Sequence, residues 1–386
     1  MIRACQTIST RVSSSIAPIA FGLGSRYTSS MPLEKLQGVK LPASADFHVH
    51  LRDGDMMELV TPTIRQGGVN TVFVMPNLVP PITTVDRALE YKQRLQKIEP
   101  NVNYLMSLYL HEDVTPETII EAKKRGITGV KSYPAGVTTN SSSGVVDYSV
   151  FYPVFEEMER QDMVLNLHGE APSTGDVTVL SAEERFLPVL GQLHERFPKL
   201  RIILEHCTTA AAIEAVKKCG PTVAGTITAH HLSIIIDSWA GDPFCFCKPV
   251  AKTPADRDAL LRAAASGNPK FFFGSDSAPH PAASKRGGDK IAAGVFTQPY
   301  TTQVVVDSFE QACENGVLKE SDITPEILEG FLSKFGRQFY GIGEEKNEFI
   351  TLEKKGENIA NILQSEKLDV VPFRRGQETW SVSWSS

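Results

Sequence analysis

Short apolar segments rich in β-branched and aromatic residues alternate with amphipathic segments along most of the chain. The apolar segments are continuous rather than strictly alternating, which is typical of strands that are covered on both faces. Eight such segments predict strands, at 45–51, 70–76, 103–110, 129–134, 163–169, 201–207, 222–229 and 270–276.

The segments between these strands have the signals of helices. Residues 115–126 place Thr115 at an N-cap, Pro116 in the first turn and Gly126 at the end. Residues 181–198 and 208–220 have the same type of pattern. Regular alternation of strand and helix predicts parallel strands with helices outside, and eight such units predict an α/β protein with a TIM-type (β/α)8 barrel.

The domain organisation follows from this repeat. A β/α barrel commonly uses about 250 residues or more as one domain, so residues 34–386 are predicted to form a single catalytic barrel. Residues past about 340, including 348–355 and the polar end WSVSWSS, predict short peripheral strands or a tail.

Charge and hydropathy limit the kinds of partner. The net charge of −6 comes without a sustained Lys/Arg stripe, which argues against nucleic acid or an anionic membrane surface as the main partner. No apolar run is long enough to cross a bilayer. A small-molecule substrate is therefore expected.

The six cysteines show no C-x-x-C pair and predict reduced thiols in an intracellular compartment. Cys245 and Cys247 form a C-x-C that is expected to pack rather than to bind a metal. Residues 1–33 contain three arginines and ten Ser or Thr but no acidic residue, which is typical of an organellar transit peptide. A mitochondrial address is expected, with a plastid, or a cytoplasmic protein with a disordered tail, as alternatives.

Candidate chemistry begins with DFHVHLRDG at the end of the first strand. On an extended strand His48 and His50 share one face, while Phe47, Val49 and Leu51 take the other. A lone H-x-H pair is more often a hydrogen-bonded pair of core histidines than a metal site. A metal site is favoured over such a pair only if other strand ends supply further ligands.

Other strand ends supply such residues. Active sites of β/α barrels lie at the C-terminal ends of the strands, so these side chains are expected to meet. Four imidazoles and a carboxylate favour zinc over calcium or magnesium, whereas a lysine ammonium would repel a divalent ion. The residues at or just beyond the strand ends are His48, His50, Arg52, Asn77, Lys131, His168, His206, Asp276 and His280.

The motifs together resemble the amidohydrolase superfamily and, within it, the dihydroorotases of the short, separate-chain type. The resemblance covers essentially residues 44 to 345 and implies reversible, zinc-dependent cyclisation of N-carbamoyl-L-aspartate to dihydroorotate in pyrimidine synthesis. It also implies a homodimer. The motifs that carry it are DFHVHLRDG, VMPNLVPPITT, GVKSYPAGVTTNSSSGV, LNLHGE, LEHCTT, CKPVAKTPADR and GSDSAPH.

The same resemblance assigns the metal ligands. It implies a carboxylated Lys131 that bridges two zinc ions, which removes the charge problem. One ion would be held by His48, His50, Lys131 and Asp276, and the other by Lys131, His168 and His206. Asp276 would also transfer the proton to the leaving nitrogen after attack by a metal-activated hydroxide.

Substrate-binding residues are implied as well. Arg52, Asn77 and His280 would bind the substrate carboxylate, for which a guanidinium is suited, and His50 and His168 would also contact substrate. Thr138 and Thr139 match a mobile loop, expected to be open or disordered without substrate. Lys248, where bacterial relatives commonly have an apolar residue, and Ala293 would line the ring.

Two other functions are alternatives to that of a dihydroorotase. Another cyclic amidase, such as a hydantoinase, dihydropyrimidinase or allantoinase, would share the metals but have less use for Arg52 and Asn77. A non-catalytic barrel, serving as a scaffold, would usually have lost metal ligands, and this chain retains all six.

Overall fold

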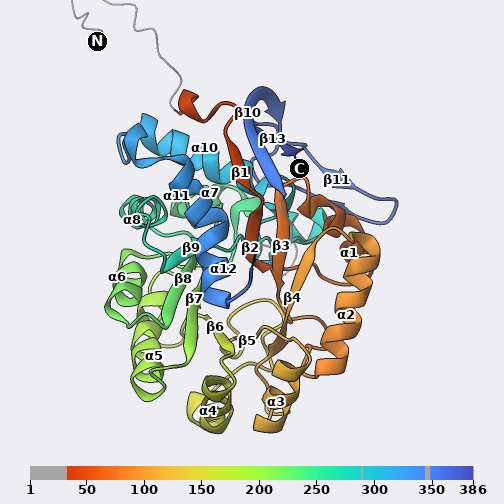
Figure 1. Ribbon diagram of the computed structural model, residues 1–386, viewed down its shortest axis with the longest axis vertical. Coiled ribbons are helices and arrows are strands. Elements are labelled where there is room, and N and C mark those ends of the chain that lie inside the picture. Colours follow the sequence, from red (N-terminus) through yellow and green to blue (C-terminus); the bar gives the residue numbers. More distant parts are fainter. Residues whose placement is uncertain (1–32, 288–289, 344–347, 386) are drawn as a thin grey trace, which may run out of the picture. The chain divides into compact units, whose positions relative to one another are not determined.

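The computed structural model describes residues 33–287, 290–343 and 348–385. At its centre, eight parallel strands are paired in sequence order and surrounded by helices (Figure 1). All eight predicted strands are present, which confirms the predicted barrel. The predicted leader, residues 1–33, lies outside the described residues apart from Leu33. The strands are β2 (Ser44–Val49), β3 (Val69–Val74), β4 (Asn103–Tyr109), β5 (Gly129–Ser132), β6 (Val164–His168), β7 (Arg201–Glu205), β8 (Val223–Ile227) and β9 (Phe271–Phe273).

The barrel closes where the last strand returns to the first. Beyond β9, the Asp276 N–H donates to the His48 carbonyl at 2.8 Å, and the His50 N–H donates to the Ser277 carbonyl at 2.9 Å. The Asp46 carboxylate accepts the Ser275 N–H at 2.7 Å across the same seam. Closure of the barrel therefore places two histidines of β2 beside Asp276.

Helices cover the outer surface of the barrel (Figure 1). α2 buries Val85, Ala88, Tyr91 and Leu95, a stripe at helical spacing that faces the strands. α3 begins after the predicted N-cap Thr115, whose side chain accepts the Thr118 N–H. The covering helices are α1 (Gly54–Val60), α2 (Val85–Ile98), α3 (Pro116–Lys124), α4 (Tyr152–Arg160), α5 (Ala182–Arg196), α6 (Ala210–Lys218), α7 (Ile236–Gly241) and α8 (Pro254–Ala264).

An aromatic cluster fills the barrel interior and corrects one prediction. The ring of Phe47 stacks on Tyr340 at 4.9 Å and packs edge-on against Phe272 at 5.4 Å. Val49 and Leu51 belong instead to the larger outer core. The prediction that Phe47 shares their face is wrong, because the β2–β3 register shifts between Asp46 and Val49.

The C-terminal part is more extensive than the predicted short strands or tail. β10 (Phe349–Asn358) pairs antiparallel with both β1 (Lys40–Pro42) and β13 (Glu378–Ser385), and β11 (Leu363–Gln364) pairs with β12 (Asp369–Val370). Trp380 of β13 is 1% exposed and donates through Nε1 to Glu310 at 3.3 Å. The serine-rich C-terminal end therefore packs as an ordered strand against α10 (Thr301–Glu314).

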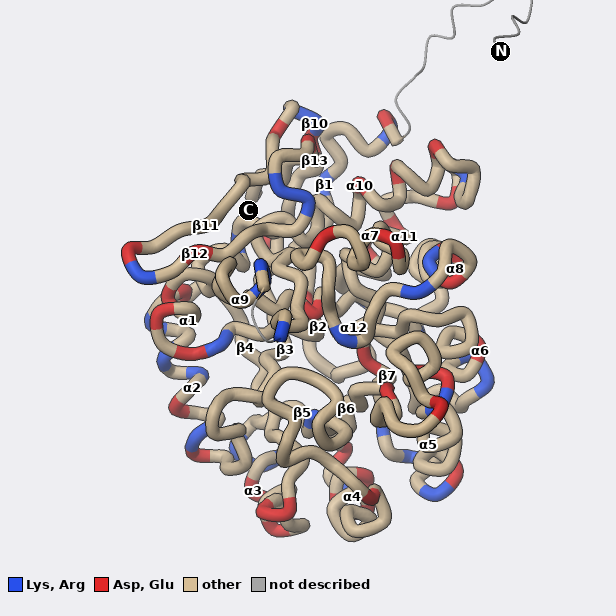
Figure 2. Tube along the Cα trace, turned by 180° about the vertical axis from the view of Figure 1, so that it is seen from behind, with Lys and Arg blue, Asp and Glu red and all other residues tan. Residues whose placement is uncertain are grey.

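Three further helices, α9 (Ala282–Arg286), α11 (Pro325–Glu329) and α12 (Phe335–Tyr340), follow the last barrel strand. Basic and acidic residues are interspersed along the outer elements (Figure 2), consistent with the absence of a single-sign stripe in the sequence. None of the helices in the described part of the chain combines the length and apolar content needed to cross a membrane.

Close packing at the base of the barrel predicts a large effect of one methyl group. In Gly336→Ala the added Cβ would lie 2.2 Å from Phe47 Cε2, so the aromatic cluster must shift. We expect destabilisation of about 1–3 kcal/mol, the usual cost of overpacking. Gly191→Ala in α5 is the control, because nothing lies within 4 Å of its Cβ. Equal thermal unfolding midpoints for the two variants would contradict the packing described.

Candidate active site

One cavity at the C-terminal ends of the strands collects most of the predicted residues. It is narrow, with room for the centre of a water-sized sphere over only about 20 Å³. Lys131 is wholly buried on β5 and His280 borders the adjoining outer pocket, so the lining of the cavity includes neither. The lining residues are His48, His50, Arg52, Asn77, Tyr133, Thr138, Thr139, His168, His206, Lys248, Asp276, Ala278, Ala293 and Gly294.

Hydrogen bonds fix which nitrogen of each β2 histidine faces the cavity. His48 Nδ1 donates to Glu205 Oε2 at 2.8 Å, and His50 Nδ1 donates to Asn77 Oδ1 at 2.8 Å. The Asn77 amide is oriented because its Nδ2 donates to the Thr139 carbonyl at 3.1 Å. Both imidazoles therefore present an unprotonated Nε2 when neutral.

These two nitrogens face a carboxylate rather than a donor. Asp276 Oδ1 lies 3.2 Å from His50 Nε2 and 3.4 Å from His48 Nε2. Burial lowers the pKa of His50 to about 4, which favours its neutral form. When both histidines are neutral, three acceptor atoms thus converge with no proton between them. This donor set fits a metal cation, for which neutral imidazole and carboxylate are ordinary ligands.

The next two histidines approach from β6 and the end of β7. Their rings lie 4.7 Å apart, and the ring of His206 lies 5.0 Å from that of His48. His168 Nε2 is bonded to Glu170 Oε2 at 2.8 Å, which leaves Nδ1 as its second nitrogen, while His206 Nδ1 is buried without a partner. Burial lowers the pKa of both imidazoles, so both are neutral ligands.

Lys131 is the only amine among the predicted metal ligands. Its side chain is fully buried, and its Nζ has no hydrogen-bond partner among the described residues. Burial lowers the pKa of Lys131 to about 8, although the charges of Glu205 and Asp276 oppose this shift. A buried amine without acceptors is costly, and a lowered pKa makes its neutral, nucleophilic form accessible near neutral pH.

Backbone conformation aims several of these side chains. Arg52, His206 and Asp276 have positive φ angles of 60°, 42° and 47°, which non-glycine residues adopt only where the surroundings enforce them. His206 follows β7 directly, while Arg52 and Asp276 each lie three residues beyond the last residue of β2 and of β9. The strands therefore turn sharply at the positions that carry the chemistry.

A cationic region lies beside the metal-ligand group. Arg52 Nε donates to the Pro279 carbonyl at 2.9 Å, and its Nη2 lies 3.1 Å from His280 Nε2. His280 Nε2 also lies 2.9 Å from the Ala293 carbonyl. Burial lowers the pKa of Arg52 to about 10, so the guanidinium remains charged. A planar cation at a cavity wall is suited to a carboxylate ligand.

The predicted loop lies over this cavity. Lys248 Nζ donates to the Val137 carbonyl at 2.9 Å, and Asn140 Nδ2 donates to the Asn77 carbonyl at 2.9 Å. Thr139 Oγ1 lies 3.4 Å from the Ala293 carbonyl. The loop is thus attached to cavity-lining residues on several sides, and the structure shows it in the covering position.

A second buried group has donor atoms close enough for a metal: His230, His231 and Cys247. Two of the three donors already have a protein acceptor, whereas neither ring nitrogen of His230 has a hydrogen-bond partner among the described residues. His231 Nε2 and Cys247 Sγ lie 3.1 Å and 3.2 Å from the Pro249 carbonyl. The bonds hold the turn that carries Lys248, in line with the packing role expected for Cys247.

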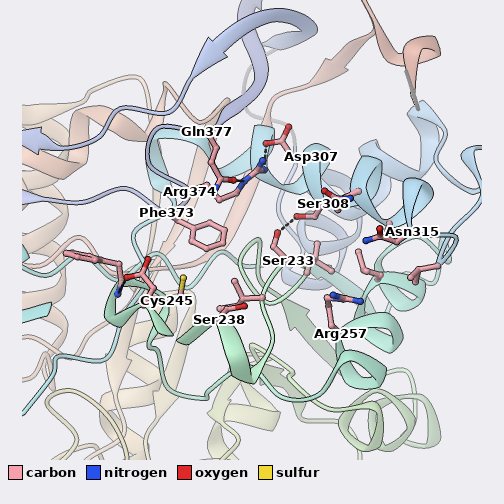
Figure 3. A pocket seen from close by; sticks show the side chains of 18 of the residues that line it. Ser233, Ser238, Cys245, Arg257, Asp307, Ser308, Asn315, Phe373, Arg374 and Gln377 are labelled. Atoms are coloured by element: carbon pink, nitrogen blue, oxygen red, sulfur yellow. Dashed lines mark hydrogen bonds and ion pairs between the residues drawn. The ribbon is translucent and has the colours of Figure 1, made fainter. Parts of the chain in front are cut away.

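A separate cavity lies between α7, α8, α10 and the segment 373–377 (Figure 3). Arg257, Arg374 and Arg375, which line it, are each paired with an aspartate of the same chain. None of the predicted site residues lines this cavity. The candidate chemistry therefore belongs to the barrel end.

Sequence reasoning missed the residues that orient the ligands. Glu205 accepts from His48, from Thr226 Oγ1 at 2.6 Å and from Asn166 Nδ2 at 2.6 Å. Glu170 performs the corresponding role for His168. The motifs LEH and HGE contain both acids beside a predicted ligand, so a search for carboxylates near metal-binding histidines would have found them.

The chain is similar to known dihydroorotases both in sequence and in structure. The chain is 52% identical over 352 residues to a probable dihydroorotase of Schizosaccharomyces pombe, covering 90% of this chain and 99% of the relative. A crystal structure of dihydroorotase from Saccharomyces cerevisiae, in complex with 5-fluoroorotic acid, matches with a TM-score of 0.85 and 47% identity, covering 90% and 99% of the two chains. An L-hydantoinase from Arthrobacter aurescens matches with a TM-score of 0.73 at 18% identity, covering 89% and 83%, and supports the fold alone. No protein family model matches the chain.

The bond between Glu205 and His48 predicts an effect on metal retention. Glu205→Gln replaces one acceptor oxygen by a donor, so His48 loses its orientation and its ligand basicity. We expect zinc affinity to fall about 10- to 100-fold, as for other carboxylates that support a metal-bound histidine. Zinc retained after dialysis against a chelator is the measurement. Glu157→Gln, another buried carboxylate, is the control, and equal zinc retention by both variants would contradict the role of Glu205.

Proposed function

The chain belongs to the dihydroorotase family, and from this premise we propose how its own residues carry out the reaction. The enzyme interconverts N-carbamoyl-L-aspartate and dihydroorotate. In the ring-opening direction, the oxygen of water adds to a ring carbonyl carbon, the carbon–nitrogen bond breaks, and the leaving nitrogen takes up a proton. In the other direction the ring closes and water is released.

We propose zinc as the metal, with two ions per chain. His48 and His50 with Asp276 supply ligands for one ion, and His168 with His206 for the other. The convergence of Asp276 Oδ1 with two unprotonated Nε2 atoms supports the first position. When bound, such ions supply a water of lowered pKa and stabilise developing negative charge on the carbonyl oxygen.

The bridge between the two positions is proposed to be Lys131, carboxylated by carbon dioxide. The neutral amine attacks carbon dioxide, a nitrogen–carbon bond forms, and loss of one proton leaves an anionic carbamate. Full burial without a hydrogen-bond partner and a pKa lowered to about 8 by burial support this assignment. The product has two oxygens where the amine has none, so it can contribute a ligand atom to each ion.

Substrate recognition is proposed to rest on the carboxylate. Arg52 brings a fixed guanidinium to the cavity wall through its bond to Pro279. Asn77 and His280 lie beside it, and Lys248 and Ala293 line the region where the ring would lie. A hydantoin or dihydrouracil ring has no carboxylate to satisfy this cation, which favours dihydroorotate over those substrates.

Asp276 is proposed to carry the proton. Asp276 Oδ1 lies 3.2 Å from His50 Nε2 and 3.4 Å from His48 Nε2, at the point where the first ion would be held. The ionised Oδ1 faces the convergence of ligands, where the attacking water would lose its proton. The same atom can then deliver that proton to the leaving nitrogen.

The loop that carries Thr138 and Thr139 is proposed to act as a lid. Its attachments to Asn77, Lys248 and Ala293 are hydrogen bonds at the cavity edge rather than apolar packing. Such contacts open at small cost, which allows substrate to enter. In the covering position the loop excludes water while charge develops.

Direct assay tests the proposed function. Purified protein supplied with zinc is incubated with dihydroorotate or with hydantoin, and ring opening of each is followed. We expect dihydroorotate to be opened far faster, with Arg52→Ala losing most of that preference. Faster opening of hydantoin by the wild type would contradict the assignment and favour a different cyclic amidase.

Removal of the bridging lysine tests the metal centre. Lys131→Ala is expected to lose most activity and much of its zinc, because no carbamate can form. Short carboxylic acids added to the variant should restore part of the activity, since their carboxylates can fill the vacated space. An amine of similar size is the control and should not restore it. Full activity and zinc content in Lys131→Ala would contradict the bridge.

Two further proposals concern the whole protein. We propose that the acid-free leader directs the chain to mitochondria and that the folded part forms a homodimer. The composition of residues 1–33 supports the first proposal, and the family resemblance is the basis of the second. Import of a reporter fused to residues 1–33 tests the address, and sedimentation of the purified protein tests the dimer. A reporter that stays in the cytosol and a monomeric sedimentation profile would contradict them.

A further inference from the structure

A buried lysine outside the predicted site joins several of its walls. Lys285 lies on α9 and is 3% exposed. Its ammonium donates to the carbonyls of Phe246 at 2.7 Å, Ala292 at 2.9 Å and Gly294 at 2.7 Å. An ammonium has three protons, so all of its donors are used by main-chain acceptors. No carboxylate of the described residues forms an ion pair with it.

The three acceptors belong to two segments that line the cavity. Phe246 precedes Cys247 and Lys248, while Ala292 and Gly294 flank Ala293 on either side. The Gly294 N–H also donates to the Phe246 carbonyl at 3.0 Å. Lys285 therefore holds the Lys248 segment and the Ala293 segment at a fixed separation.

This arrangement determines where the Ala293 carbonyl points. The carbonyls of Ala292 and Gly294, before and after it, both accept from Lys285, whereas the Ala293 carbonyl does not. The Ala293 carbonyl accordingly points away from Lys285, toward His280 Nε2 at 2.9 Å and Thr139 Oγ1 at 3.4 Å. The segment is also tied to Ala278, whose N–H donates to the Val295 carbonyl at 2.9 Å, and it packs so closely there that a Cβ added at Gly294 would lie 2.4 Å from the Ala278 carbonyl.

The orientation of this carbonyl in turn determines that the Nε2 atom of His280 carries a proton. A carbonyl only accepts, so the close contact requires a proton on His280 Nε2. That nitrogen then cannot accept a hydrogen bond from Arg52 Nη2, 3.1 Å away. The guanidinium is left with donor capacity for a ligand, and the protonated Nε2 edge of His280 adds to the positive potential around it.

We infer that Lys285 is a positioning residue for the substrate carboxylate, acting through the Ala293 carbonyl on His280 and Arg52. This inference rests on the proposed function for its substrate. Lys285 itself does not line the cavity, so it touches neither substrate nor reacting atoms. Its loss should weaken binding of the carboxylate more than it slows the chemical step. Burial lowers the pKa of Lys285 to about 8, so the ammonium persists at neutral pH.

A substitution series at this position tests the inference. Lys285→Met keeps the length of the side chain but removes every donor, Lys285→Gln keeps an amide donor, and Lys285→Arg keeps both charge and donors. Lys252→Met is the matched control, because Lys252 is also buried and donates to the Val179 and Val250 carbonyls, both at 2.9 Å, away from Ala293.

We expect KM for dihydroorotate to rise about tenfold in Lys285→Met, the effect of weakening one charge-assisted hydrogen bond, while kcat and zinc content change little. Lys285→Gln should be intermediate, and Lys285→Arg and Lys252→Met should remain near the wild type. An unchanged KM in Lys285→Met, or a fall in kcat with loss of zinc, would overturn the inference. If Lys285→Met does not fold, Lys285→Gln is compared with Lys285→Arg. Equal KM values for these two variants would overturn the inference.

A second measurement needs no substrate. Hydrogen exchange of the Gly294 and Ala292 amides should be faster in Lys285→Met or Lys285→Gln than in the wild type, and unchanged in Lys252→Met. Protection equal to that of the wild type would overturn the positioning role even if the protein opens a different ring. A wild-type enzyme inactive on dihydroorotate, with faster exchange in the variants, would contradict the proposed substrate but leave the positioning of Ala293 supported.

Discussion

The burial of one amine is the constraint around which the site is arranged. Lys131 lies on a barrel strand with its Nζ shielded from water and without a protein acceptor among the described residues. The neighbouring imidazoles are neutral, because burial lowers the pKa values of His168 and His206. The charges of Glu205 and Asp276 favour a charged ammonium only in part, since burial still lowers the pKa of Lys131 to about 8. The proposed anionic carbamate would instead be stabilised by two neighbouring cations, and Lys131 would then lie at the centre of the proposed metal cluster.

The same region closes the barrel. The backbone bonds that join β9 to β2 lie at His48, His50, Asp276 and Ser277, so the seam includes three of the proposed ligands. Positive φ angles at Arg52, His206 and Asp276 show that the backbone here follows the needs of the site rather than local preference. Metal binding should therefore stabilise the folded barrel, since the ligands exist in this arrangement only when the seam is closed.

The sequence was sufficient to predict the architecture, and it pointed to side chains that the structure brings together, for reasons that are local. Apolar runs identified each strand, and strand ends identified the histidines, because parallel strands carry their final residues to one rim. Phe47 could not be placed correctly, since a register shift in β2 depends on pairing with β3. Lys285 gave no signal at all. Its three acceptors are carbonyls, which every residue possesses, and only the folded chain brings those of Phe246, Ala292 and Gly294 together.

Carbon-13 labelling tests the central claim most directly. The metal-free enzyme is reconstituted with zinc in the presence of labelled bicarbonate, and the carbon spectrum is recorded beside that of a Lys131→Ala sample. The account predicts one carbamate signal per chain in the wild type, which is lost when the metal is removed by acid and is absent from the variant. A fully active, zinc-loaded wild type without that signal would contradict it, because Lys131 would then remain an amine.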